Sequence, residues 1–153
     1  DLSLASFLSN RAEDDGRRRM ASGPYGGNYA ISTALHIRYP KVGQGESTSV
    51  MQPTALRMAA DQVEEGQAKH VAEALGVWRD GMSPAAAARE VAGALDGIYT
   101  KVGVPTRVSQ LDILKDDLIN IARETVKNFN ANRGARSPDE QVADALKLLE
   151  AAW

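Results

Sequence analysis

The side chains best suited to chemistry lie in one short stretch that contains His36, Gln44, Gly45 and Glu46. His36 precedes a loop that the proline and glycines of residues 39–45 predict, and the other three residues end or follow that loop. Imidazole and carboxylate groups are suitable ligands for a divalent first-row metal, and an amide oxygen can bind a hard cation. From residue types alone, His36 is therefore the candidate metal ligand, with Gln44 and Glu46 following it in the loop.

The remaining reactive side chains give weaker evidence for a metal-binding, catalytic or nucleotide-binding site. Helical spacing supplies no second ligand for His36, because the residue four positions later is Pro40. His70 stands alone on a predicted helix, where a histidine is usually a surface or satisfied group. Ser47 follows the loop with no histidine near it in sequence, so we expect it to cap a helix rather than act as a nucleophile. Residues 43–45 lack the dinucleotide-binding glycine pattern, and no strand precedes them.

Composition excludes several classes of protein. The chain has 153 residues, no cysteine, and 18 basic against 20 acidic residues, for a net charge of −2. It is long enough for one hydrophobic core, and it cannot form disulfides or thiolate metal sites. The near-neutral charge disfavours a nucleic-acid-binding regulator. The sequence contains no apolar run that would span a bilayer and no signal-peptide pattern, so we expect a soluble, cytoplasmic protein.

The spacing of apolar residues predicts an all-α, bundle-like domain. No segment alternates as an exposed strand does, and the aromatic content of only 5% beside abundant alanine also favours helix. We expect a single domain over 1–153, with a helix and a connector in 1–27. Further helices are expected near residues 29–36, 46–60, 66–76, 84–102, 114–129 and 138–153.

Several residues mark the ends of these helices. Ser83-Pro84 predicts a helix start and Gly103 the end of the same helix. Ser137-Pro138-Asp139-Glu140 has the pattern of a capping box. Pro53 predicts either a kink or a helix start near it. In the helix over 84–102, the stripe expected to face the core consists of Ala87, Val91, Leu95, Ile98 and Val102.

Two longer segments carry a more specific pattern. Residues 42–57 combine Gly45, a run of small residues, Pro53 and then Leu56-Arg57, and residues 103–111 begin with Gly-Val-Pro-Thr. Both resemble the iron-containing (group III) alcohol dehydrogenase family, which includes maleylacetate reductases and methanol dehydrogenases. Residues 130–133 and 151–153 are similar to the end of that family. The resemblance runs in order over about residues 28–153.

The resemblance implies a two-domain enzyme, of which this chain is the all-α C-terminal half on the substrate and metal side. The N-terminal α/β half, which binds NAD or NADP, would precede Asp1, so we expect the chain to be part of a longer polypeptide. A divalent metal (iron, zinc or magnesium) would polarise the alcohol oxygen during hydride transfer. Aligned without gaps from Pro53, the metal histidines of the family fall on Gln44 and Ala30, and a histidine near the nicotinamide falls on Ala34. A local gap would bring His36 to one of these positions. The resemblance thus implies a substrate cleft lined by His36, Gln44, Gly45 and Glu46. His36 and Gln44 are its candidate metal ligands, and Gln44 is also expected to hydrogen-bond substrate or water.

The function expected from the resemblance is interconversion of a primary alcohol and its aldehyde, with NAD or NADP as the hydride carrier. The alternative is a metal-free, non-catalytic helical domain that serves oligomer assembly or scaffolding. In either case we expect a partner domain before Asp1 and a homo-oligomer, because helical halves of this kind expose apolar surface to their neighbours.

Overall fold

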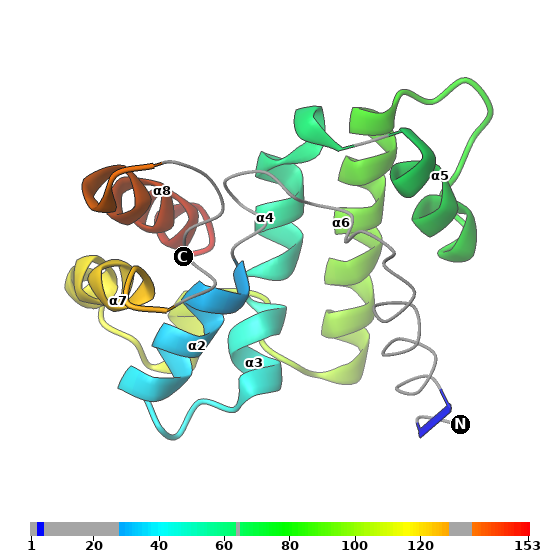
Figure 1. Ribbon diagram of the computed structural model, residues 1–153. Coiled ribbons are helices and arrows are strands. Elements are labelled where there is room, and N and C mark those ends of the chain that lie inside the picture. The colour runs from blue at the N-terminus through cyan, green and yellow to red at the C-terminus, as the bar shows by residue number, and fades with distance from the viewer. Residues whose placement is uncertain (1–2, 5–27, 64, 129–135) are drawn as a thin grey trace.

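The computed structural model describes residues 3–4, 28–63, 65–128 and 136–153. All regular structure in these residues is helical, which confirms the all-α prediction (Figure 1). Apart from residues 3–4, which are helical, the helix and connector expected in 1–27 lie outside the described residues. The α-helices are α2 (Asn28–Arg38), α3 (Gln44–Ser49), α4 (Gln52–Met58), α5 (Glu65–Ala74), α6 (Pro84–Val102), α7 (Leu118–Thr125) and α8 (Pro138–Ala151). Three short 3₁₀ turns are η2 (Ala60–Gln62), η3 (Val108–Leu111) and η4 (Lys115–Asp117).

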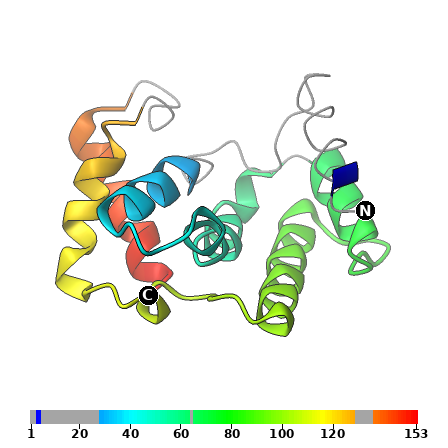
Figure 2. The same ribbon diagram turned by 90° about the horizontal axis from the view of Figure 1, so that it is seen from below.

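The helices form two hydrophobic cores that meet at α4. One core lies among α2, α7 and α8, and the other lies between α4, α5 and α6 (Figures 1 and 2). Ala55 belongs to the first core and Leu56 to the second. Successive residues of a helix point about 100° apart, so neighbouring positions of α4 can serve both cores. α4 therefore lies between the two cores and contributes buried side chains to both.

The helix ends follow the predicted capping residues. The Ser83 hydroxyl accepts a hydrogen bond from the Ala86 amide at 3.2 Å, and α6 ends at Gly103, whose φ of 76° favours glycine. At the start of α8, the amide of Ser137 donates to the Glu140 carboxylate at 2.7 Å. The Ser137 hydroxyl accepts from the Glu140 amide in return, which completes the capping box.

The segment 46–60, expected to be helical with a kink or a helix start near Pro53, contains two helices. α3 ends at Ser49 and α4 begins at Gln52, with the fully buried Val50 and Met51 between them. Pro53 lies in the first turn of α4, where its missing amide hydrogen has no helical partner to lose, so the expected helix start is confirmed. The predicted loop over 39–45 ends at Gly43, since Gln44 and Gly45 already belong to α3.

Two other predictions about apolar residues need correction. Ala87 and Val91 are fully buried, but Ile98 and Val102, at the C-terminal end of the expected α6 core stripe, are 44% and 65% exposed. α5 packs against α6, and its buried residues belong to the same core as Ala87 and Val91 of α6. Leu114 is 72% exposed and precedes η4, so α7 begins four residues later than predicted. The predicted end of that helix, Phe129, lies outside the described residues.

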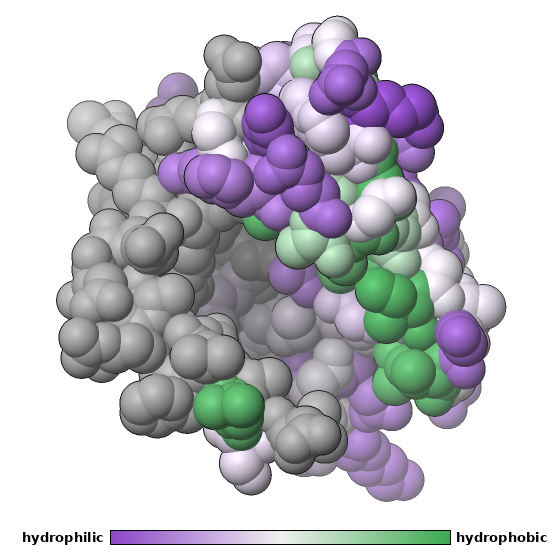
Figure 3. Space-filling view, turned by 90° about the vertical axis from the view of Figure 1, so that its right-hand side faces the viewer, coloured by the Kyte–Doolittle hydropathy of each residue, from purple (hydrophilic) through white to green (hydrophobic). Residues whose placement is uncertain are grey.

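Hydrophobic side chains also reach the surface beside α5 and α6. In the face drawn in Figure 3 they lie in the lower right, whereas hydrophilic residues cover the upper part. None of the helices in the described ranges is both long and apolar enough to cross a membrane.

Candidate functional site

The loop between α2 and α3 is fixed by hydrogen bonds to its own neighbours. His36 is exposed at the end of α2, and its ring nitrogen Nδ1 lies 3.2 Å from the Val42 carbonyl oxygen. A carbonyl oxygen only accepts, so Nδ1 is the donor of this hydrogen bond. The Val42 amide in turn donates to the Tyr39 carbonyl at 2.9 Å. His36 is thereby held against the loop that leads to Gln44.

The other predicted site residues form the first turn of α3. Gln44 and Gly45 are exposed, while Glu46 is half-buried. The Glu46 carboxylate accepts a hydrogen bond from the Gly43 amide at 2.8 Å, so it caps its own helix. The Ser47 hydroxyl donates to the Gln44 carbonyl at 2.9 Å, a contact within the same helix. Gln44 is the side chain of this turn that faces solvent without serving as a cap.

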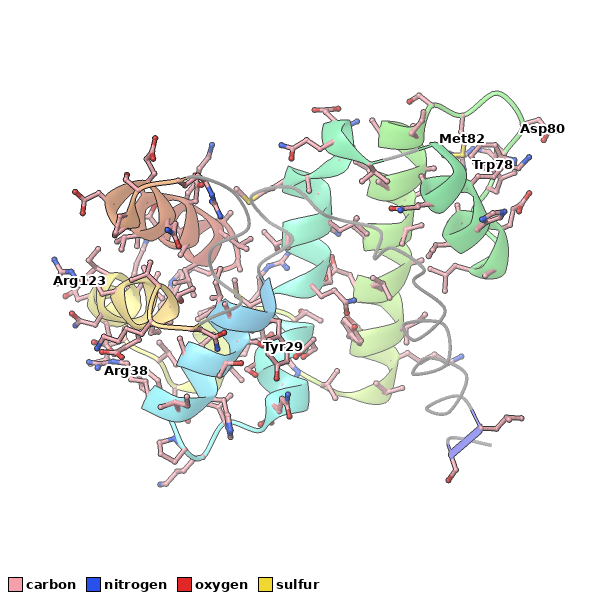
Figure 4. All side chains as sticks on the ribbon, viewed as in Figure 1. Tyr29, Arg38, Trp78, Asp80, Met82 and Arg123 are labelled. Atoms are coloured by element: carbon pink, nitrogen blue, oxygen red, sulfur yellow. The ribbon has the colours of Figure 1, made fainter. Side chains whose placement is uncertain are left out.

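An ion pair joins the end of α2 to the start of α7. Asp117 receives two hydrogen bonds from Arg38, at 2.5 and 2.6 Å, and one from the Tyr39 hydroxyl at 2.6 Å. Figure 4 labels Arg38 at the end of α2. The Asn120 amide adds a fourth at 2.7 Å. These donors, Arg38 above all, hold the pKa of Asp117 well below its usual range. Burial and the hydrogen bond to Asp117 raise the pKa of Tyr39.

A pocket of about 340 Å³ opens between α2 and the end of α7. One wall comes from α2, and the other comes from α7 and the turn that follows it. The lining residues are Thr33, Ala34, Ile37, Glu124, Lys127 and Asn128. Sequence reasoning pointed only to Ala34 of these six, through the resemblance. The others come together because α2 packs against α7, and no local pattern in the sequence predicts that pairing.

The pocket and His36 belong to different faces of α2. Ala34 and Ile37 line the pocket and lie three residues apart, which places them on one side of the helix. α2 is a continuous α-helix, so a side chain two residues after Ala34 points about 160° away from it. The exposed His36 therefore faces away from Ala34, and the pocket lining does not include it.

The described residues do not fit a complete metal centre. Within the described ranges, no three histidine, aspartate or glutamate side chains gather where they could hold a metal ion together. A catalytic zinc takes three protein ligands, and His36 with Gln44 would supply only two donors from this chain. The predicted ligand role of His36 and Gln44 stays a prediction, and none of the chemistry proposed below passes through a metal.

Comparison with known proteins gives one clear result. The family model described as Fe-containing alcohol dehydrogenase family, C-terminal, matches residues 19–153. This range contains every helix from α2 to α8. None of the curated proteins compared matches the chain.

Proposed function

The chain belongs to the Fe-containing alcohol dehydrogenase family, as the C-terminal part of its members, and from this we propose that it forms the helical, substrate-side half of an NAD(P)-dependent alcohol dehydrogenase. The match over residues 19–153 is the observation that supports this proposal most.

The proposed reaction transfers a hydride between C4 of the nicotinamide and the carbon of a primary alcohol or its aldehyde. NAD or NADP would be held by an N-terminal domain that is separate from residues 1–153. That domain would cover the exposed surface of α2 and α3, where His36, Gln44, Gly45 and Glu46 would line the substrate cleft.

We also propose a homo-oligomer. Ile98 and Val102, on the exposed part of the α6 stripe, are 44% and 65% exposed. The two side chains lie one turn apart on the same helix, and exposed apolar patches mark sites of contact with other domains or subunits.

The proposal is tested on the full-length gene product. Primary alcohols should support reduction of NAD or NADP, seen as the absorbance of the reduced nicotinamide, and the metal content should be measured on the same sample. Turnover with either cofactor supports the proposal. A folded full-length protein that binds neither cofactor and turns over no alcohol or aldehyde contradicts it.

The second candidate is a helical domain of the same family that is not catalytic and serves assembly or scaffolding. The observation that favours it is the chemistry of α2, where the fully buried Ala30 and the nearly buried Ala34 offer no ligand atoms. For this candidate we expect a stable oligomer with no metal and no effect of nicotinamide on its thermal stability. The same cofactor and metal measurements therefore separate the two functions.

A further inference from the structure

The candidate site residues lie on both sides of the loop that joins α2 to α3, residues 39–43. His36 is in the last turn of α2 before this loop, and Gln44 begins α3 directly after it. The loop is short and lies at the bottom of Figure 1. Its path therefore decides how His36 and Gln44 are placed relative to each other, and the contacts that fix this path bear on the proposed cleft.

Tyr39, the first residue of the loop, is held at both parts of its side chain. The half-buried ring packs against the core among α2, α7 and α8. The hydroxyl donates a hydrogen bond to Asp117 at 2.6 Å, although the two residues are 78 positions apart in the sequence. The side chain of Asp117 is only 14% exposed, and Arg38 also holds it. A hydrogen bond to an ionised carboxylate is stronger than one between neutral groups, so the start of the loop is anchored to the protein beyond the loop.

Hydrogen bonds continue from Tyr39 back to His36. The Tyr39 carbonyl accepts from the Val42 amide at 2.9 Å, and the Val42 carbonyl accepts from Nδ1 of His36 at 3.2 Å. The hydrogen bond that one nitrogen of a histidine makes sets the role of the other nitrogen. Since Nδ1 donates to Val42, a substrate or a water molecule would meet His36 through Nε2. The series Asp117, Tyr39, Val42 and His36 thus fixes the orientation of the imidazole ring.

A second tyrosine makes the same kind of bond away from this loop. The hydroxyl of Tyr99, on α6, donates to the side chain of Gln52 at 2.5 Å. Tyr99 is half-buried as Tyr39 is, and burial raises the pKa of both hydroxyls, so both are protonated donors at neutral pH. Tyr99 and Gln52 belong neither to the α2–α3 loop nor to the proposed cleft, so Tyr99 provides a matched control.

We propose that Tyr39 is a positioning residue, whose bond to Asp117 holds the α2–α3 loop so that His36 presents Nε2 to the substrate; this inference rests on the proposed dehydrogenase function. Tyr39 acts through His36 and does not itself touch substrate or cofactor. Removal of the hydroxyl leaves the ring in the core but releases the loop from Asp117. A small displacement of a group that meets the substrate is enough to lower turnover.

The first test observes His36 directly in the full-length protein, labelled with ¹⁵N in its histidines. The signals of His36 are those lost in His36→Gln. At about pH 8.5, where an ordinary histidine is neutral, the wild type should carry its ring hydrogen on Nδ1. Tyr39→Phe should move part of this hydrogen to Nε2, seen as opposite changes in the shifts of the two ring nitrogens. Tyr99→Phe should leave both signals as in the wild type.

The second test measures alcohol turnover with the nicotinamide cofactor. Tyr39→Phe should lower kcat/KM by about 3- to 10-fold relative to Tyr99→Phe, as expected for the loss of one hydrogen bond that the reaction uses. In the His36→Gln background the same change should cost less than about twofold, because the residue through which Tyr39 acts is absent. A purely structural loss would lower kcat/KM in both backgrounds. If His36→Gln has no measurable turnover, the comparison with Tyr99→Phe decides.

The outcomes separate this inference from the proposed function. In an active enzyme, a Tyr39→Phe variant that matches Tyr99→Phe in the His36 signals or in kcat/KM would overturn the inference alone. An equal loss in the wild-type and His36→Gln backgrounds would do the same. A folded wild type without nicotinamide turnover would overturn the proposed function, and the inference with it.

Discussion

Asp117 and Arg38 form a two-point ion pair, with Nε and Nη2 of the arginine 2.5 and 2.6 Å from the two carboxylate oxygens. The pair connects the last residue of α2 to the residue just before α7. The side chain of Asp117 is only 14% exposed, and it also accepts hydrogen bonds from Tyr39 and Asn120. The Asp117 carboxylate therefore holds the end of α2 against the start of α7, the two helices that enclose the pocket. It also holds Tyr39, the first residue of the α2–α3 loop.

Replacing Asp117 with Asn should lower the thermal stability of the full-length protein. Asn keeps one acceptor oxygen but loses the charge that Arg38 faces, and solvent screens part of this effect because Arg38 is 37% exposed. We expect Tm to fall by about 2 to 4 °C at pH 7. Arg89→Gln is the control, because it removes an ion pair with Asp61 in which both side chains are largely exposed. That variant should change Tm much less.

The stability that Asp117 contributes should also depend on pH. The pKa of Asp117 is lower in the folded state than the value of about 3.9 expected for an unfolded chain. The folded state therefore binds its proton less readily, and the contribution is complete above about pH 5 and is lost as the pH falls below about 4. The Tm difference between wild type and Asp117→Asn should be constant from about pH 7 to 5 and shrink below that. A difference that grows on acidification would contradict this assignment.

Gln44→Ala tests the predicted role of the exposed turn of α3. Loss of one hydrogen bond to substrate or water should reduce kcat/KM of the full-length enzyme by about 5- to 10-fold. The matched change is Gln62→Ala, which removes another exposed glutamine at the end of η2. Unaltered alcohol turnover together with unaltered metal content would remove Gln44 from the site.

Two leucines that differ in burial test the core among α2, α7 and α8. Leu148 is fully buried, and its truncation to Ala should lower the free energy of unfolding by about 2 to 5 kcal/mol. Leu114 is 72% exposed, so the same change should alter that free energy by less than about 0.5 kcal/mol. Urea unfolding of both variants, read by circular dichroism, gives the comparison. Equal losses would mean that Leu114 packs against a part of the protein outside this chain.

Two glycines of the same helix should respond to alanine in opposite directions. Gly97 lies within α6 with open space where a Cβ would stand, so Ala should raise the free energy of unfolding by about 0.5 to 1 kcal/mol. Gly103 ends the helix with a φ of 76°, where an alanine Cβ meets its own carbonyl and costs about 1 to 2 kcal/mol. Thermal unfolding of the two variants should therefore shift Tm upward and downward, respectively. Shifts of the same sign would show that one of these backbone assignments is wrong.

Sequence predictions were accurate where an interaction joins residues close together in the sequence, and less accurate where it joins distant residues. The starts of α6 and α8 were predictable because Ser83 and Ser137 each cap amides only three residues away. Pro53 predicted a kink or a helix start, but not which of the two, nor that residues 50–51 would separate two helices, since Val50 and Met51 continue an apolar pattern and are buried in a core with residues distant in sequence. The α6 stripe was predicted correctly at Val91 but not at Val102, because periodicity locates an apolar face without showing how far a neighbouring helix covers it.

The sequence by itself determined the helical class, most helix positions and the candidate residues around Gln44, because periodicity, capping and turn formation act over a few residues. Only the tertiary structure decided which helix faces meet. It placed Lys127 and Glu124 opposite Ala34, turned His36 to the other side of α2, and joined Arg38 to Asp117 across 79 positions. Such pairings depend on the shapes and charges of surfaces that form only after the helices have packed together.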